Sequence, residues 1–503
     1  MKMNLLKSIL VICIMACFVP LSSSAYDFMV DGFAYYRNSD GKSVTVTYIT
    51  KESNLNVQGN LVIPDSVQYE GQFFTVTAIG DSAFYQSKIT SLIIPETILS
   101  IGERSFKNNN ELKSVVLGGS VVEIGKEAFG WCTSLISISI PESVVSIGDE
   151  AFVACNKLET LSIGNSVRSL GNYAFRSCSK LSTLTFGKSV VSIGDFAFAE
   201  CESLESVITN DALKYVGKHS FSNCNKLKSI NLGKSVTVID EYAFSYCPEL
   251  TSIVIPDSVV TIGFSAFFNC TNLVSVHLGK SVTHIESWAF IYCSSLKTID
   301  LPSSLRSIGN GAFSRCNSLT SVALNDSIYA IDMNAFYHCS SLTEIQLPAS
   351  ISTVETDVFK GCNSLERIVI PSSVKTIRAG AFSGCSSLID VYAHLPHPSL
   401  VTLGYEIFKD APFDRCTLHV PRGKNKAFSM ASQWEAFGTI IGDLEPEPLG
   451  DTDCDGLVDI SDVNYNINVM LGKDAANEVV DVNDDGVVDI TDVNMVINLM
   501  LGK

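Results

Sequence analysis

The chain has 503 residues, of which 46% are apolar, so it can fold around a large core and is not a disordered protein. Asp and Glu outnumber Lys and Arg by 53 to 35, and the formal net charge is −18. Because a phosphate backbone is bound by a basic surface, this excess of acids argues against a nucleic acid as partner. Twelve of the acids fall in residues 450–503 together with only two lysines, so the acidity is concentrated near the C-terminus.

Residues 1–25 have the pattern of an export signal. A short basic start at 1–7 precedes an apolar run at 8–21 and the small residues Ser-Ser-Ala that end at Ala25. We therefore expect a signal peptide that is cleaved after Ala25, and a mature protein that is secreted or held at the cell surface. The alternative is a lipoprotein with a lipid on Cys17. No later segment has the roughly 20 uninterrupted apolar residues of a membrane-spanning helix.

A phenylalanine recurs through the middle of the chain at a spacing of 22 residues once and of 23 residues thereafter. Each unit approximates A-F-x-x-C-x-x-L-x-x-I-x-I-P-x-S-V-x-x-I-G, which contains the L-x-x-L-x-L signature of a leucine-rich repeat. The fourteen positions are Phe84, Phe106, Phe129, Phe152, Phe175, Phe198, Phe221, Phe244, Phe267, Phe290, Phe313, Phe336, Phe359 and Phe382.

The spacing within a unit predicts its local structure. In the third unit Ile138 fits a short strand that points it into the core, while Ser137 points outward. Pro141 cannot donate to a strand ladder and is expected to end the strand, and Gly148 is expected to give the backbone the freedom to turn. Phe129 then packs behind the strands. One strand per unit predicts an α/β repeat fold, a leucine-rich-repeat solenoid with one parallel β-sheet.

A single unit cannot bury its own apolar face, so the units must stack and the two ends need caps. We expect an N-terminal cap at 26–78, a solenoid of about 14 units at 79–395 and a C-terminal cap at 396–444. The linker at 445–449 contains two prolines, which favour an extended spacer, and a separate small domain follows at 450–503.

Twelve of the sixteen cysteines lie three residues after a repeat phenylalanine. Their equal spacing favours a column of buried thiols, in which cysteine acts as a small apolar residue. Ser87 and Asn109 occupy the same slot in the first two units. Disulfides between neighbouring units remain the alternative, because such cysteines would lie near bonding distance. The twelve are Cys132, Cys155, Cys178, Cys201, Cys224, Cys247, Cys270, Cys293, Cys316, Cys339, Cys362 and Cys385.

Residues 450–503 contain two matching acidic loops 30 residues apart, each followed by an apolar helical stretch, at 463–471 and 493–501. Calcium takes six to eight oxygen ligands, and loop positions 1, 3, 5, 9 and 12 with the carbonyl of position 7 supply them in EF-hand-type loops. Two Ca²⁺ ions are therefore expected. The expected ligands are Asp451, Asp453, Asp455, the Leu457 carbonyl, Asp459 and Asp462 in the first loop, and Asp481, Asn483, Asp485, the Val487 carbonyl, Asp489 and Asp492 in the second.

The repeat motif resembles the BspA-like subclass of leucine-rich repeats, and the likeness covers residues 26–444. This resemblance implies a secreted or surface protein with a role in adhesion, and it supplies no catalytic residues. The doubled loop-helix pattern with Asp at position 12 resembles a type I dockerin, a small all-α calcium-binding domain. That resemblance implies a cohesin-type partner, recognised by Ile460, Ser461, Ile490 and Thr491. The alternative is a calcium-stabilised tail that has no cohesin partner.

The outward strand positions are where a solenoid usually binds its ligand. Hydroxyl residues fill the position eight after the phenylalanine in ten units, from Ser114 to Ser321, which suits either a regular ligand or a crowded sheet. The row two residues further on varies from unit to unit. Mixed charge beside an aromatic residue is typical of a protein interface. The favoured binding patch is therefore Glu344, Arg367, Val369, Asp390 and Tyr392.

Nothing in the sequence favours an enzyme. The seven histidines lack metal-ligand spacing, and no G-x-S-x-G element occurs. We therefore expect a non-catalytic extracellular binding protein, whose solenoid binds a protein or glycan and whose tail attaches it to a cohesin-type partner. The alternative is a structural or targeting subunit of a polysaccharide-degrading, cellulosome-like assembly with no ligand of its own on the solenoid.

Overall fold

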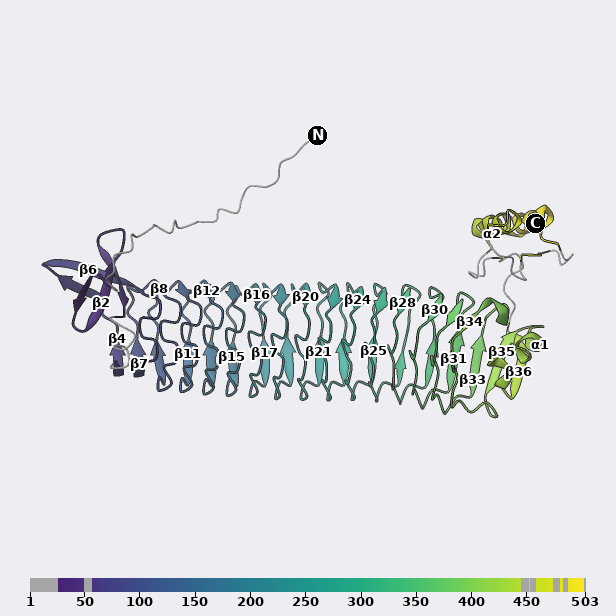
Figure 1. Ribbon diagram of the computed structural model, residues 1–503, viewed down its shortest axis with the longest axis horizontal. Helices are drawn as coiled ribbons and strands as arrows, with labels where there is room; N and C mark the ends of the chain where they lie inside the picture. The colour runs from purple at the N-terminus through teal and green to yellow at the C-terminus, as the bar shows by residue number, and fades with distance from the viewer. Residues whose placement is uncertain are drawn as a thin grey trace, which may run out of the picture.

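The computed structural model contains a long solenoid followed by two short helices (Figure 1). The expected signal peptide at 1–25 and the linker at 445–449 lie outside the described residues. No helix among the described residues is long and apolar enough to cross a membrane. The structure describes residues 26–48, 57–444, 452, 458–473, 480–482 and 487–501.

The first series of strands forms what we call the front face of the solenoid. Neighbouring coils pair in parallel and in register, as Ser137 does with Thr160 and Ile138 with Leu161. The strands alternate exposed and buried side chains, as the two-residue period predicts. The front-face strands are β4 (Gln58–Val62), β7 (Lys88–Ile93), β9 (Ser114–Val116), β11 (Ser137–Ser139), β13 (Thr160–Ser162), β15 (Thr183–Thr185), β17 (Ser206–Ile208), β19 (Ser229–Asn231), β21 (Ser252–Val254), β23 (Ser275–His277), β25 (Thr298–Asp300), β27 (Ser321–Val322), β29 (Glu344–Gln346), β31 (Arg367–Ile370), β33 (Asp390–Ala393), β35 (Thr417–Pro421) and β36 (Thr439–Leu444).

A second series of strands forms the back face, so the expectation of one sheet with one strand per unit is wrong. Each unit pairs a second time at its S-V-x-x-I-G segment, where Ile147 lies between Ile124 and Leu170. A strand of two residues is too short to show an alternating pattern, which is why the sequence did not reveal it. The back-face strands are β8 (Ser100–Ile101), β10 (Glu123–Ile124), β12 (Ser146–Ile147), β14 (Ser169–Leu170), β16 (Ser192–Ile193), β18 (Tyr215–Val216), β20 (Val238–Ile239), β22 (Thr261–Ile262), β24 (His284–Ile285), β26 (Ser307–Ile308), β28 (Ala330–Ile331), β30 (Thr353–Val354), β32 (Thr376–Ile377) and β34 (Thr402–Leu403).

The third side of each coil, which we call the turn face, contains the Ala-Phe segment. Residues 79–395 are all described and contain no helix, so the α/β description of the repeat is wrong as well. In the fourth unit Glu150 and Ala154 have φ of 56° and 57°, which interrupts any helical progression. The turn segments bond from coil to coil instead, as the Phe152 N–H does to the Ala174 carbonyl at 2.7 Å.

The repeat phenylalanines form one continuous stack inside the solenoid. Successive rings from Phe84 to Phe382 are nearly parallel, with centroids 5.1–5.7 Å apart. The stack continues to Phe408, which lies 5.4 Å from Phe382, so residues 396–444 contain one further coil before the chain closes the core. Burial of these rings is a main source of the stability of the solenoid.

Both ends of the phenylalanine stack are closed by rings that meet it edge-on. At the N-terminal end Phe33 lies 6.3 Å from Phe84 at 76°, and at the C-terminal end Phe437 lies 5.3 Å from Phe408 at 85°. An edge-on ring covers the last face and presents no parallel face on which another unit could stack. The closing elements are the strands β1 (Phe28–Val30), β2 (Phe33–Arg37), β3 (Ser43–Thr47), β5 (Ser66–Tyr69) and β6 (Gln72–Ile79) at one end, and η2 (Pro398–Leu400), α1 (Asn425–Ser429) and η3 (Trp434–Ala436) at the other.

The twelve repeat cysteines are buried thiols, as favoured from their spacing. Each thiol donates to the carbonyl of the phenylalanine in the preceding unit, at 3.1–3.5 Å. Asn109 fills the same slot and donates to the corresponding Phe84 carbonyl at 2.8 Å. Burial raises the pKa of the Cys155 thiol to about 12. These thiols are therefore protonated donors that satisfy a buried carbonyl in each unit.

Gly148 lies at a close approach of two coils and not at the turn expected from the sequence. A β-carbon at this position would lie 2.7 Å from the backbone of Gly125 in the preceding coil. The positive φ of the turn falls on Glu150 instead. Asp240 and Glu286 occupy the equivalent position in other units, so the close approach favours glycine without demanding it in every coil.

The tail contains the two helices expected from the sequence, α2 (Ile460–Met470) and α3 (Ile490–Met500). Each begins three residues before its apolar stretch because the aspartate at loop position 9 caps it. The two helices share a small core of Val463, Val482, Val493 and Val496.

Candidate functional site

The hydroxyl row lies on the front face and is fully open to solvent. All ten of its residues, from Ser114 to Ser321, are exposed, and each stands at the start of a front-face strand. Their side chains lie in register across the sheet, as Ser252 does with Ser275 and Ser275 with Thr298. The row ends where larger charged residues take the same position.

The five residues of the C-terminal patch, Glu344, Arg367, Val369, Asp390 and Tyr392, are brought together as expected. Strands β29, β31 and β33 pair in register, which sets Glu344 beside Arg367 and Arg367 beside Asp390. Charges therefore alternate in sign across three neighbouring strands, an arrangement that stabilises the sheet locally. The Arg367 guanidinium also lies 5.8 Å from the ring centroid of Tyr392, within cation–π range.

His419 completes this patch and was not predicted from the sequence. Its ring stacks on Tyr392 with centroids 4.3 Å apart and planes 8° apart. Its Nδ1 lies 2.8 Å from Asp443 Oδ2, and its Nε2 lies 3.3 Å from Asp390 Oδ1. Because β31 and β35 flank β33 on opposite sides, Arg367 and His419 hold the Tyr392 ring between them.

The signal for His419 was present in the sequence but weak. The segment Thr417–Pro421 repeats the strand alternation of the earlier units, yet the spacing to the previous unit departs from 23 residues. In the part of the chain that the structure describes, no Ser, Thr or Cys side chain hydrogen-bonds to His419. The histidine is therefore paired with carboxylates and not with a nucleophile.

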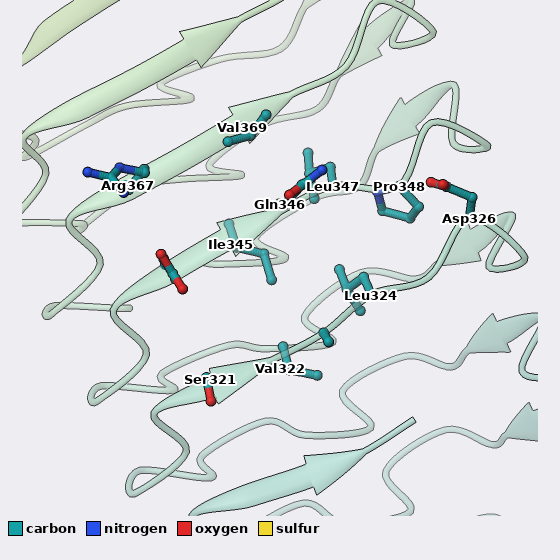
Figure 2. A pocket seen from close by; sticks show the side chains of 12 residues that line it. Ser321, Val322, Leu324, Asp326, Ile345, Gln346, Leu347, Pro348, Arg367 and Val369 are labelled. Carbon is teal, nitrogen blue, oxygen red and sulfur yellow. The ribbon is translucent and has the colours of Figure 1, made fainter. Parts of the chain in front are cut away.

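A hollow of about 580 Å³ lies beside the patch (Figure 2). It occurs where β27 and β29 are neighbours in the solenoid but belong to different pairing ladders. Glu344, Arg367 and Val369 of the patch are among its lining residues, and Asp326 lies at the end opposite Arg367. Its lining is mixed, with charged and polar side chains beside apolar ones such as Val322 and Val369. A hollow of this kind can bind a side chain or short segment of a partner.

In the tail, both position-12 aspartates are buried and hydrogen-bonded in the same way. Asp462 accepts the Thr452 N–H at 2.6 Å and the Asp459 N–H at 2.8 Å. Asp492 accepts the Val482 N–H at 2.7 Å, and the Asp489 N–H lies 2.9 Å from its other oxygen. The two halves of the tail therefore fold alike around their last loop carboxylate.

The position-9 aspartates cap the two helices. Asp459 accepts from the Ser461 N–H and Asp489 from the Thr491 N–H, each at 2.7 Å. The backbone N–H and hydroxyl of Ser461 lower the pKa of Asp459. The hydroxyl and N–H of Thr491 lower that of Asp489 in the same way.

Only two of the remaining expected calcium ligands lie among the described residues. Asp481 and Val487 are described, whereas Asp451, Asp453, Asp455, Leu457, Asn483 and Asp485 lie outside the described residues. Among the residues that are described, no three His, Cys, Asp or Glu side chains meet in a way that could hold a metal ion.

The expected partner-binding residues of the tail stand at the start of each helix. Ile460 and Ile490 are 60% and 56% exposed, although both are large and apolar. Thr491 is exposed. Ser461, whose backbone N–H donates to Asp459, is half-buried. The two isoleucines occupy equivalent positions of the duplicated pattern.

Comparison with known families decides the nature of the repeat. The profile of the BspA type leucine rich repeat region, six copies long, matches residues 77–191, 122–251, 169–297, 237–366 and 309–433. The chain belongs to the BspA-type leucine-rich-repeat family. No curated protein matches the chain.

One solved structure supports the same assignment. A leucine-rich repeat protein from Bacteroides ovatus is 32% identical, with a TM-score of 0.63, and the match covers 73% of this chain and 94% of that one, so the two share the parallel solenoid. Further matches are a leucine rich cell surface protein from Faecalibacterium prausnitzii, 29% identical over 73% of this chain and 94% of that one with a TM-score of 0.45, and the pneumococcal vaccine antigen PcpA, 18% identical over 84% and 100% with a TM-score of 0.42.

Proposed function

We propose that this BspA-type protein is a non-catalytic extracellular binding protein with two binding regions, the C-terminal patch of the solenoid and the calcium-binding tail. The observation that carries the first region is the Tyr392 ring held between Arg367 and His419 beside a hollow of mixed polar and apolar lining. Tyr and Arg are the side chains that most often dominate binding energy at protein interfaces. Export rests on the signal-peptide pattern of residues 1–25.

The patch has the features that a protein ligand requires. Arg367 and Glu344 are exposed, while Tyr392 and Asp390 are half-buried and held by neighbours, so a partner would meet a preorganised surface. Preorganisation reduces the conformational entropy that is lost on binding. The solenoid supplies this rigidity because β31 and β33, which carry Arg367 and Tyr392, are each paired on both sides.

Binding by the full chain tests the first region. Purified extracellular-matrix proteins are passed over immobilised protein, and the affinity of each is measured by interferometry. We expect the double substitution Arg367→Ala and Tyr392→Ala to weaken binding at least tenfold, whereas Ser137→Ala with Ser139→Ala, on the same face but far along the chain, leaves it unchanged. Equal binding by both variants would contradict the proposal, and no binding to any matrix protein would favour a structural subunit with no ligand on the solenoid.

The tail is proposed to bind two Ca²⁺ ions through its acidic loops. The donor set consists of carboxylate, amide and carbonyl oxygens, which are the ligands of a hard cation. Ionised Asp459 and Asp489 and the duplicated geometry around Asp462 and Asp492 support it. Because metal binding and folding are coupled in small domains, we expect a chelator to unfold the tail.

The tail is further proposed to be a dockerin that attaches the chain to a cohesin-type module. The support is the duplicated pattern and the exposure of Ile460 and Ile490, since apolar side chains left in solvent commonly mark a protein interface. A purified cohesin module is titrated with the full chain. We expect binding that needs calcium and that is lost on changing both isoleucines to Asp. Binding that persists in chelator would contradict a calcium-dependent dockerin.

A further inference from the structure

The turn face has a strip of aromatic rings, two exposed and two half-buried, that neither binding region uses. Strip residues come from five consecutive coils, and we call Tyr246, Phe268, Tyr292, Arg315 and Tyr337 the aromatic strip. Tyr246 and Phe268 have centroids 5.0 Å apart, and Phe268 and Tyr292 lie 5.9 Å apart. The Arg315 guanidinium then lies 5.5 Å from the Tyr292 ring and 5.9 Å from that of Tyr337, so the contacts are continuous.

The rings of the strip are tilted, which leaves ring surface open to solvent. Successive planes in the strip meet at 59° and 75°. In the row two residues before the repeat phenylalanines, Tyr173, Phe196 and His219 stack with planes only 5° and 9° apart and cover one another's faces, although Phe264 and Trp288 further along the turn face are tilted. A stacked row is explained by its own packing, whereas the strip is not.

Two tyrosines of the strip are open to solvent. Tyr246 is 43% exposed and Tyr292 is 39% exposed. Their positive φ, 55° and 62°, belongs to the repeat, because residues as different as Glu200 and Trp131 share it at the equivalent position. The exposure of the two rings is therefore what distinguishes them.

The chemistry of the strip points to a neutral polymer. The two residues that follow the phenylalanine in these five coils include no Asp or Glu, although the formal net charge of the whole chain is −18. A polyanion would be repelled by the protein as a whole, but an uncharged ligand would not. Tyr246 and Tyr292 lie two coils apart, about 10 Å at the usual strand spacing, which is comparable to the repeat of an extended disaccharide.

We propose that the aromatic strip binds a neutral glycan chain that runs along the solenoid axis. The C–H face of a pyranose ring packs on an aromatic ring, while its hydroxyls accept from Arg315 and exchange hydrogen bonds with Asn269. A protein partner would instead need pockets for its anchoring side chains. The strip repeats one kind of contact from coil to coil, as a ligand of repeated sugars requires.

Affinity electrophoresis of the full chain tests this inference. Native gels contain one soluble polysaccharide each: a mixed-linkage β-glucan, a xylan, a galactomannan or, as the acidic case, polygalacturonate. We expect at least one of the three neutral polymers to retard the protein. Tyr246→Asn with Tyr292→Asn should weaken that interaction at least tenfold, and Arg315→Gln should weaken it less.

Asparagine already occupies the equivalent position at 223 and 269, so the double variant should keep its fold, which a thermal melt checks. Tyr173→Asn is the matched control, since it removes a tyrosine at positive φ from the stacked row, and it should bind like the unmodified chain. Three results would overturn the proposal: no retardation by any neutral polymer, retardation by polygalacturonate alone, or equal retardation of the double variant. Loss of matrix-protein binding in the double variant without any effect of glycans would assign the strip to a protein.

Discussion

At the residue scale, the slot three residues after the repeat phenylalanine contains a small side chain that, from the second unit onward, donates a hydrogen bond to the preceding coil. Cys132 donates with its thiol and Asn109 with its amide, and both bond to a phenylalanine carbonyl. The sequence indicated the small size from the equal spacing. It did not indicate the donor, because the acceptor is a backbone group of the preceding coil.

Thiol titration checks the cysteine column. Thirteen cysteines, the twelve of the column and Cys416, are buried and free. We expect a thiol reagent such as Ellman's to leave these thirteen unreacted in the folded protein, since the thiolate is the reactive form and burial disfavours it. All thirteen should react in denaturant without a reductant. Fewer than thirteen reactive thiols in denaturant would show that some are disulfide-bonded.

The packing of Gly148 gives a second prediction at this scale. Gly148→Ala places a methyl group 2.7 Å from the Gly125 backbone, so the two coils must shift apart to admit it. We expect a loss of roughly 1–3 kcal/mol in the free energy of unfolding, measured with urea. Gly119→Ala is the control, because the nearest atom there is a carboxylate oxygen of the flexible Glu96 side chain. If Gly148→Ala is no more destabilised than the control, close coil packing is not the reason for the glycine.

At the scale of the element, the phenylalanine stack carries much of the stability of the solenoid. Phe244 is fully buried between Phe221 and Phe267, at 5.5 and 5.4 Å. We expect Phe244→Ala to lower the free energy of unfolding by about 3–5 kcal/mol. Ile208→Ala, at a side chain that is 69% exposed, should change it by less than about 0.5 kcal/mol. Similar effects of the two substitutions would contradict a continuous buried stack.

We expect the stability of the folded tail to depend on pH because aspartates cap its helices. Hydrogen bonds lower the pKa of Asp459 and Asp489 in the folded tail, so folding is favoured while both are ionised. This contribution is present above the unfolded pKa of about 4 and is lost as the pH falls below it.

The repeat units have no helix, so circular dichroism at 222 nm on the full chain reports mainly α2 and α3. We expect helical signal to fall below about pH 4, and Asp489→Ala to lower it already at neutral pH. A helical signal that stays constant down to pH 2 would contradict this role of the caps.

Prediction from sequence succeeded for elements with a strong period and failed for short ones. Ser137 and Ile138 alternate clearly, and β11 lies where they place it. The second strand at Ser146–Ile147 is only two residues long, so its existence depends on the neighbouring coils. The conformation of the turn segment could not be predicted from the sequence either, because the positive φ falls on residues such as Glu150 that show no preference for it.

At the scale of the whole molecule, the repeated positions and the variable positions have different roles. The repeated positions build the core, and the candidate sites occur where the repeat changes, as at Arg367 and Tyr246. The patch could be predicted from its five residues because parallel pairing brings equivalent positions together. His419 could not, since it lies in a coil whose spacing departs from the repeat.

Attachment through the acidic tail depends on its binding of calcium. Isothermal titration of the full chain with CaCl₂ tests it most directly. We expect two ions per chain, one after Asp462→Asn, and none after Asp462→Asn with Asp492→Asn, because each substitution removes the last carboxylate of one loop. The absence of any heat of binding from the unmodified chain, or two ions still bound by the double variant, would contradict it.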